Sequence, residues 1–400
     1  SMLIDRQSDG FIIWDEEAHI NSANEKLGYR IHPDLFKIHS QYDMDSAFEK
    51  KKLLQTAENF DSGDEDSYKG TEDAKRVKLQ LFDGNLDTLN TQLSAIATAV
   101  KKYGREIGRY RREIPANNNL SARAKAKEGM EAELKLMTHG VFPSTQSEPI
   151  DQFSAEMLTV MSPWFESREE EGRILKISKQ SQEREYLIPP EVSFHIGDAT
   201  QVNNFYHHTG DDYDFIVMDP PWHNLSVKRK RTYETSDDVI GAIDMPNILK
   251  NEGMLAIWVT NAPRVHKMVH ATLAEWRMMR VGVWFWLKTT TSGRPTTPFI
   301  PYTSGKQPYE GIIFCVRKVD EKQMRLQGKL PPQELVIAST PMCVHSRKPS
   351  LIEIYRKMMP AKSAMKPLEI FARSLTSGCA SIGYEPLLLQ NTAFFEKIET

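Results

Sequence analysis

The sequence contains little cysteine and no long apolar run. Its 400 residues include three scattered cysteines, an odd number that excludes a disulfide framework and a paired-cysteine metal site: Cys315, Cys343 and Cys379. No stretch approaches the roughly 20 apolar residues of a membrane helix, and the first residues lack the apolar core of a signal peptide. We therefore expect a protein of the nucleus or cytosol, with no bound metal and no membrane contact.

An excess of charge of one sign is also missing, because 51 Lys and Arg face 54 Asp and Glu. The net charge of −3 excludes a bulk polycation. The charge is uneven, however: seven acidic residues oppose one lysine over 58–73, and ten basic residues oppose five glutamates over 101–140. The acidic stretch is typical of a solvated linker. The basic stretch leaves nucleic acid open as a partner, since a binder needs to be basic only where the phosphates lie.

Differences in composition and hydrophobic pattern divide the chain into three parts. We predict an N-terminal region with the acidic linker over 1–75, a helical hairpin as accessory region over 76–150, and an α/β domain over 151–400. In the last part, short β-rich runs alternate with helical segments after Pro263 and over 350–359. This alternation predicts a mostly parallel sheet covered on both faces, with ligands beyond the carboxyl ends of the strands.

The accessory region has the clearest helical pattern. Apolar residues at spacings of three and four predict one long amphipathic helix: Leu79, Phe82, Leu86, Leu89, Leu93, Ile96, Val100, Tyr103, Ile107 and Tyr110. A second helix is predicted over 122–137. An antiparallel hairpin is the simplest arrangement; we expect a monomer, and a dimeric coiled coil stays open. Four arginines interleave with two tyrosines, which suits RNA binding or a solvated face: Arg105, Arg109, Arg111 and Arg112 with Tyr103 and Tyr110.

One predicted strand ends in Asp219-Pro220-Pro221-Trp222. This tetrapeptide is typical either of a rigid turn with a core tryptophan or of a site that methylates an exocyclic amine. In the second case, the Asp219 carboxylate and the Pro220 carbonyl each accept an amine N–H, and Trp222 offers a flat face for the base. The prolines cannot donate backbone hydrogen bonds, so the strand end stays open towards a ligand. Such a transfer needs alignment more than acid–base chemistry.

The motif and its neighbours resemble the MT-A-seventy family of adenine-N6 methyltransferases, and most closely its methyltransferase-like protein four branch. The resemblance covers about residues 185–390 in order. Its segments are Tyr186-Leu187-Ile188-Pro189-Pro190, Ser226-Val227-Lys228-Arg229, Tyr233 with Ser236-Asp237-Asp238, Trp258-Val259-Thr260-Asn261, Lys306 with Pro308-Tyr309-Glu310-Gly311, His345-Ser346-Arg347-Lys348-Pro349 and Leu368-Glu369-Ile370-Phe371-Ala372-Arg373.

The resemblance implies S-adenosylmethionine as methyl donor, S-adenosylhomocysteine as product and a Rossmann-like sheet. It implies a permuted motif order, in which the Asp219 strand precedes the donor-binding strand 368–371, behind a largely helical N-terminal region. The implied catalytic residues are Asp219, Pro220, Pro221 and Trp222. The implied donor-binding residues are Asp198 and Ala199 at the adenine end, Lys348 and Asp219 at the methionine end, and Phe371 and Arg373 towards the ribose.

The resemblance also implies a set of residues that bind the target: Asn224, Lys228, Arg229, Tyr233, Trp286, Lys288, Lys306 and Glu310. The basic run 228–231 fits phosphate contact, a nuclear localisation signal or a solvated loop. The sequence departs from the family near its end, where Tyr384 replaces an expected asparagine, and Cys379 and Ile382 replace tryptophans. This departure puts a ribose contact in doubt.

The leading hypothesis is an enzyme that methylates adenine N6 in RNA. The resemblance implies an internal 2′-O-methyladenosine of a spliceosomal small nuclear RNA, in the nucleus. DNA adenine methylation is the alternative, although a duplex target requires base flipping. A catalytically inactive nucleic-acid-binding subunit is the alternative of another class. Methylation of a protein amide would more naturally use an Asn-Pro-Pro motif than Asp219.

Overall fold

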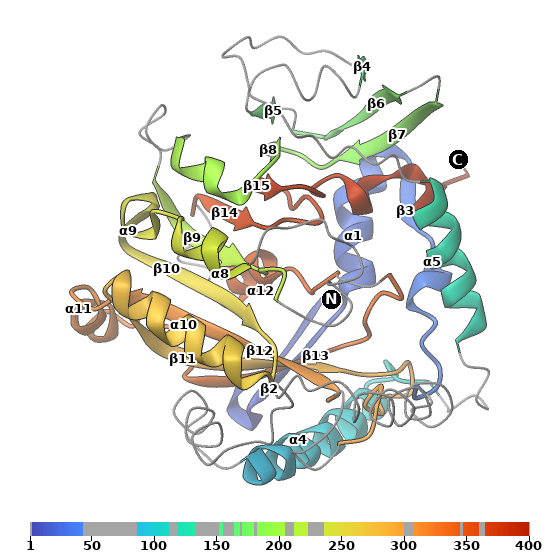
Figure 1. The fold of residues 1–400 in the computed structure, drawn as a ribbon. Helices are drawn as coiled ribbons and strands as arrows, with labels where there is room; N and C mark the ends of the chain where they lie inside the picture. Colours follow the sequence, from blue (N-terminus) through green and yellow to red (C-terminus); the bar gives the residue numbers. More distant parts are fainter. Residues whose placement is uncertain are drawn as a thin grey trace, which may run out of the picture.

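A central sheet of eleven strands organises the molecule (Figure 1). The computed structural model describes residues 2–42, 86–111, 119–132, 152–154, 164–168, 170–179, 182–204, 212–222, 236–299, 307–344, 347–359 and 365–399. The strand order is β1-β2-β13-β11-β12-β10-β9-β14-β15-β8-β5. Six of the ten neighbouring pairs are parallel. The predicted α/β fold with a mostly parallel sheet is confirmed.

The short β-rich runs that predict the α/β domain form strands. The strands of the sheet are β1 Leu3–Arg6, β2 Phe11–Trp14, β5 Phe165–Ser167, β8 Val192–Ile196, β9 Tyr213–Met218, β10 Leu249–Val259, β11 Met278–Lys288, β12 Tyr309–Arg317, β13 Glu334–Ser339, β14 Pro367–Ile370 and β15 Ala380–Gly383. Two smaller sheets join β16 Phe395–Lys397 with β3 Tyr29–Ile31, and β4 Gln152–Ser154 with β6 Arg173–Lys179 and β7 Gln182–Ile188.

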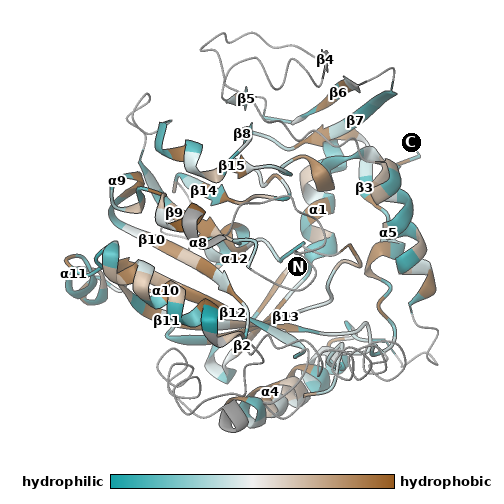
Figure 2. Ribbon diagram, in the orientation of Figure 1, coloured by the Kyte–Doolittle hydropathy of each residue, from teal (hydrophilic) through white to brown (hydrophobic). Residues whose placement is uncertain are grey.

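The side chains of β9 alternate between two apolar cores because successive residues of a strand point to opposite faces. Ile216 and Met218 pack with α8 Ser236–Gly241, α9 Met245–Ile248 and α10 Pro263–Glu275. Phe215 and Val217 pack with α11 Glu321–Leu326 and α12 Leu351–Met358 on the other face. Figure 2 shows apolar colours along much of β10, as a strand buried on both faces requires.

The two helices of the accessory region differ from the predicted hairpin. Helix α4, Leu86–Glu106, lays its apolar residues against β2, β11 and β13, with Leu93 and Val100 fully buried there. Helix α5, Leu120–Ala132, packs instead against the short 3₁₀ turns Pro33–Phe36 and Thr392–Phe394, which Figure 1 shows on another side of the molecule. Each helix thus packs into a different core of the chain, so the two do not form the predicted hairpin.

Helix α4 ends earlier than the spacing predicted. After Glu106 the chain turns at Gly108, whose φ of 70° suits glycine, and the Tyr110 ring folds back onto Gly104. A Cβ atom at Gly104 would lie only 2.1 Å from that ring. Ile107, predicted in the apolar seam, is exposed. The tyrosine is therefore used for packing, and it is not available as a stacking platform for RNA.

The N-terminal segment is part of the sheet and not a separate region. Strand β2 pairs in parallel with β13, and β1 pairs with β2, so both extend the sheet of the α/β domain. Helix α1, Glu16–Asn24, follows β2 directly, with Asp15 accepting a hydrogen bond from Ala18 N as its N-cap. No helix in the described ranges combines the length and apolar character needed to cross a bilayer.

Candidate active site

The carboxyl ends of the strands bring the predicted site together. Asp219 follows β9, Trp258 lies near the end of β10, Lys288 ends β11, and Arg373 follows β14. Glu310 comes at the start of β12, but β12 runs antiparallel to β10 and β11, so its first residues lie at the same edge. Residues from distant parts of the sequence thus meet at this edge.

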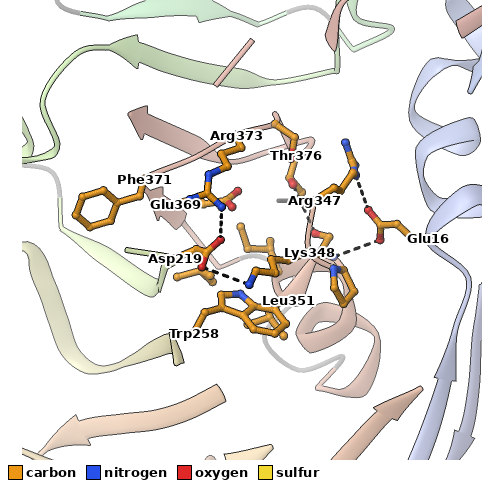
Figure 3. Close-up of a pocket in the computed structure, with 15 residues that line it drawn as sticks. Glu16, Asp219, Trp258, Arg347, Lys348, Leu351, Glu369, Phe371, Arg373 and Thr376 are labelled. Atoms are coloured by element: carbon orange, nitrogen blue, oxygen red, sulfur yellow. Dashed lines mark hydrogen bonds and ion pairs between the residues drawn. The ribbon is translucent and has the colours of Figure 1, made fainter. Parts of the chain in front are cut away.

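Asp219 lies in a pocket and contacts two cations (Figure 3). Its Oδ2 accepts a hydrogen bond from Arg373 Nη1 at 2.9 Å, and its Oδ1 lies 3.6 Å from Lys348 Nζ. The Asp219 side chain is only 11% exposed. Charge-assisted bonds of this kind fix the orientation of a carboxylate more firmly than neutral ones.

A second carboxylate extends this arrangement into a chain of charges. Glu310 binds Lys348 Nζ through one oxygen and Lys288 Nζ through the other. Burial opposes ionisation of Glu310, but the two lysines outweigh it and hold its pKa well below the ordinary value. Burial likewise opposes the charge on Lys348, but Asp219 and Glu310 outweigh it and raise its pKa. Lys348 therefore stays cationic, between the two carboxylates.

Each of the two lysines also contacts a tryptophan ring. Lys348 Nζ lies 5.0 Å from the centre of the Trp258 ring, and Lys288 Nζ lies 4.7 Å from the centre of Trp286. The two indoles meet edge to face, with centres 5.9 Å apart. Trp286 is fixed by a 2.7 Å hydrogen bond from its Nε1 to Ser339 Oγ. Trp286, Lys288 and Glu310, all predicted to bind the target, thus lie together beside Lys348.

The Trp222 side chain is less open than the motif predicted. Its Nε1 donates to the Trp258 carbonyl oxygen at 2.9 Å, and only 5% of the residue is exposed. The indole belongs to the apolar core shared with α8 and α10. The Pro220 carbonyl also accepts the Trp222 backbone N–H at 2.8 Å, which closes a tight turn after Asp219. The motif therefore forms a tight turn, and of its four residues Asp219 lines the pocket.

The other end of the predicted donor site lies at the end of β8, three strands from β9 in the sheet. Asp198 follows β8, and its Oδ1 accepts hydrogen bonds from the backbone and hydroxyl of Thr200 at 2.8 and 2.5 Å. Its Oδ2 accepts the Tyr384 hydroxyl at 3.2 Å. Ala199 is buried directly after it. Asp198 therefore caps a turn, and it lies at the carboxyl edge of the sheet, where the resemblance places the adenine end of the donor.

Phe371 follows β14, which lies in the sheet between the strand of Asp219 and the strand of Asp198. It has a φ of 64°, an uncommon backbone conformation for a side-chain-bearing residue, and it lines the pocket next to Arg373. The backbone of 371–372 passes so close to Gly383 that a Cβ atom there would lie 3.0 Å from Ala372 N. Strand β15 thus needs a glycine where it packs beside this turn.

Glu369 is a pocket residue that had no role in the sequence analysis. It lies on β14 in the same pocket as Asp219 and Arg373 (Figure 3). Burial, together with the charge of Asp219, raises the pKa of its carboxyl to about 7. Its position two residues before Phe371 in the matched segment was the available signal.

Two further pocket residues come from opposite ends of the chain. Glu16 and Arg347 form a buried ion pair with Nε and Oε1 at 2.9 Å. No periodicity or spacing connects residues 331 positions apart, so no pattern in the sequence predicts this pair. Five predicted target-binding residues lie outside the described residues: Asn224, Lys228, Arg229, Tyr233 and Lys306.

Comparisons with known proteins identify this arrangement. The MT-A70 family model matches residues 213–385, which include Asp219, Glu310, Lys348 and Arg373. The segment 213–385 is therefore an MT-A70 domain. The chain is 29% identical to a "DNA N6-methyl methyltransferase" of Caenorhabditis elegans over 97% of this chain and 98% of that protein.

Other relatives match over a shorter part. An "N6-methyladenosine RNA methyltransferase MTA1" of Pyricularia oryzae is 34% identical over 51% of this chain and 55% of its own length. The "N(6)-adenine-specific methyltransferase METTL4" of Homo sapiens is 33% identical over 54% of this chain. The chain spans about half the length of these two relatives.

The comparisons confirm the predicted family and its methyltransferase-like protein four branch. They also confirm the predicted class of enzyme, an S-adenosylmethionine-dependent adenine-N6 methyltransferase of nucleic acid. RNA and DNA adenine methylation both occur in the names of the relatives. The choice between these substrates is a separate question.

Proposed function

We propose that the chain methylates N6 of adenosine in RNA, and that its target is an internal 2′-O-methyladenosine of a spliceosomal small nuclear RNA. The observation that carries the chemistry is Asp219, buried at the end of β9 and held by Lys348 and Arg373. An exocyclic amine is a poor nucleophile because its lone pair is delocalised into the ring. In this proposal the carboxylate accepts an N–H of the amine and orients the lone pair.

The pocket has the chemistry that S-adenosylmethionine requires. In this proposal Lys348 supplies a cation for the donor carboxylate, and Arg373 lies towards the ribose. Asp198, at the end of β8 and outside the pocket lining, supplies acceptors for hydroxyl and amino groups near Tyr384. The ends of β9, β14, β15 and β8 follow one another in the sheet, so three strand spacings of about 4.8 Å separate the first from the last. An elongated donor suits such an edge. When bound, it would supply an electrophilic methyl group, while the protein aligns the amine and excludes water.

We assign the two strands in a permuted order. The strand with the acceptor motif, β9, precedes β14, and the two are parallel neighbours. In the proposal, β14 supports the donor through Phe371 and Arg373, and β9 supports the target amine. Lys288 and Glu310, on β11 and β12, lie on the side of β9 away from β14. Lys348 links them to Asp219, and this network would align the target amine.

RNA is favoured for two reasons. A single-stranded target spares most of the cost of flipping a base out of a duplex. Two fungal relatives are named as RNA methyltransferases. A nuclear location and a monomeric state accompany this proposal as expectations from the sequence.

DNA is the second candidate because of one specific finding. The relative that matches nearly the whole chain, in Caenorhabditis elegans, is named as a DNA methyltransferase. A binding subunit without activity fits the pocket less well, because Asp219, Lys348 and Arg373 are all in place.

The test is methyl transfer to matched oligonucleotides, scored as N6-methylated nucleoside by mass spectrometry. The set contains RNA with and without a 2′-O-methyl on the target adenosine, and single-stranded and duplex DNA. Product on 2′-O-methylated RNA that disappears with Asp219→Ala supports the proposal. Product only on DNA replaces it by the second candidate. No product, with no binding of S-adenosylmethionine, supports the inactive subunit.

A further inference from the structure

We infer that Glu16, at the start of helix α1, is a positioning residue for Lys348. The inference rests on the proposed function, because it concerns how the N-terminal segment sets the donor-side cation of the same pocket. Glu16 and Lys348 both line that pocket. The connection is the segment 347–350, which carries Lys348 between two residues that Glu16 binds.

The carboxylate of Glu16 uses both oxygens in this connection. Oε1 accepts from Arg347 Nε at 2.9 Å, and Oε2 accepts from the backbone N–H of Ser350 at 3.3 Å. The bonds thus hold residues on either side of Lys348 (Figure 3). The Arg347 side chain points to Glu16 and the Lys348 side chain points to Asp219.

Glu16 is itself fixed to the sheet. The indole Nε1 of Trp14, the last residue of β2, donates to Glu16 Oε2 at 2.7 Å. Trp14 is 1% exposed, and β2 pairs with β13 in the central sheet. The Glu16 carboxylate therefore links Trp14 in the sheet to the segment 347–350, which carries Lys348.

Burial makes this connection specific. The side chains of Arg347 and Glu16 are 7% and 4% exposed. A buried ion pair is a poor source of net stability, but loss of one partner leaves an uncompensated charge, so the pair admits few other arrangements. Ser350 also caps α12 by accepting a hydrogen bond from Glu353 N at 3.4 Å, so the far side of the segment is anchored as well.

The consequence is that Lys348 reaches Asp219 and Glu310 from a fixed backbone. Its ammonium contacts both carboxylates at the end of a long, flexible side chain. A displacement of about 1 Å at such a site is enough to reduce function strongly. In this view the first residues of the chain complete the active site.

The test compares Glu16→Gln with Glu353→Gln in the full chain. Glu353 forms a partly buried pair with Arg356 at 2.5 Å and does not line the pocket, so the control makes the same chemical change. Calorimetry measures the affinity for S-adenosylmethionine without turnover, and thermal unfolding measures stability. We expect Glu16→Gln to weaken donor binding by about tenfold, as loss of outer supporting groups commonly does. We expect Glu353→Gln to lower stability only.

A double-mutant cycle shows whether Glu16 acts through Lys348. In a Lys348→Met background, Glu16→Gln is expected to change donor affinity by less than about twofold, because the residue that it positions is gone. An equal loss of affinity in both backgrounds would overturn the inference. So would donor binding that is unchanged by Glu16→Gln while stability falls. Glu16→Asp, which keeps the charge, is expected to retain more affinity than Glu16→Gln.

The proposed function fails in a different way. If the unmodified chain binds no S-adenosylmethionine, the methyl-transfer proposal itself is wrong. If the chain binds the donor, and Lys348→Met weakens that binding while Glu16→Gln does not, only the positioning role is wrong. The two failures are therefore distinguishable in one set of titrations.

Discussion

The Tyr384 hydroxyl donates a hydrogen bond to Oδ2 of Asp198 at 3.2 Å. This contact gives a structural role to the residue at which the sequence departs from its family. Tyr384 follows β15 and Asp198 follows β8, and these strands are parallel neighbours. The tyrosine thus orients the carboxylate that we expect at the adenine end of the donor, where an asparagine would reach less far.

Tyr384→Phe tests this interpretation. A hydrogen bond to a charged group contributes about 1.5–3 kcal/mol, so we expect donor affinity to fall by at least about tenfold. Calorimetry with S-adenosylhomocysteine measures the change, and Asp198→Asn is the reference for loss of the acceptor. Unchanged affinity in Tyr384→Phe would show that the hydroxyl contributes nothing to the donor site.

Asp219→Asn is expected to reduce methyl transfer by at least about 100-fold, as loss of one orienting group in an active site commonly does. The amide keeps the shape but removes the charge that holds Lys348 and Arg373. Single-turnover assays with saturating donor separate this loss from weaker donor binding.

Asp214→Asn is the matched control. Asp214 lies on the same strand, β9, and pairs with Lys250 at 3.2 Å. It does not line the pocket. We expect normal methyl transfer in this variant. A similar loss of activity in both variants would mean that β9 is sensitive to any substitution and that Asp219 has no special role.

The sequence predicted the parts of the fold that depend on local pattern. Runs such as Leu255–Val259 are apolar on both faces, and this property alone identifies a central strand. The family resemblance, and no local pattern, implied Asp219, Lys348 and Arg373 as parts of one donor site, and the structure brings them together in one pocket. The exposed Ile107 shows the limit of periodicity, since one glycine with positive φ ended the helix before it.

Contacts between distant segments could not be predicted in this way. The spacing of apolar residues in α4 indicates that one face is buried, but it does not say against which surface. The insertion of β2 beside β13 depends on pairing across more than 300 residues. The same holds for Glu16 and Arg347, whose meeting depends on that pairing.

Glu369→Gln is expected to change the pH dependence of stability. The pKa of Glu369 is raised from its ordinary value of 4.5 to about 7 in the folded protein. Between these values the folded state binds more protons than the unfolded state, so this group lowers stability as the pH rises. The glutamine variant lacks this loss. At pH 8 we expect the free energy of unfolding of the variant to exceed that of the unmodified chain by up to about 3 kcal/mol. Near pH 4.5 we expect the two free energies to differ little.

Glu310→Gln is expected to change the pH dependence of stability in the opposite direction. The pKa of Glu310 is held below its ordinary value by Lys348 and Lys288 against the effect of burial, so its contribution to stability is present above that ordinary value. It is lost as the pH falls through the lower, folded-state pKa. Denaturant unfolding at several pH values measures both differences. If the Glu369 difference grew towards low pH, the assigned direction of its shift would be wrong.

Neutralising the basic run 228–231 is expected to weaken RNA binding and to flatten its salt dependence. The run contains four cations, Lys228, Arg229, Lys230 and Arg231. Each phosphate contact on a single strand contributes about 0.7 to the slope of log affinity against log salt. Replacement by glutamine should therefore lower the slope by up to about 3, with similar losses for different sequences.

Fluorescence anisotropy at several salt concentrations measures this slope. A variant with Lys318 and Lys322 replaced by glutamine is a control for charge removed outside the matched target-binding segments. We expect the control to keep the slope, because only cations that contact phosphate release counterions. An unchanged slope in the 228–231 variant would mean that the run is a surface loop or a localisation signal. Equal losses in both variants would indicate a diffuse effect of net charge, since local phosphate contacts cannot explain them.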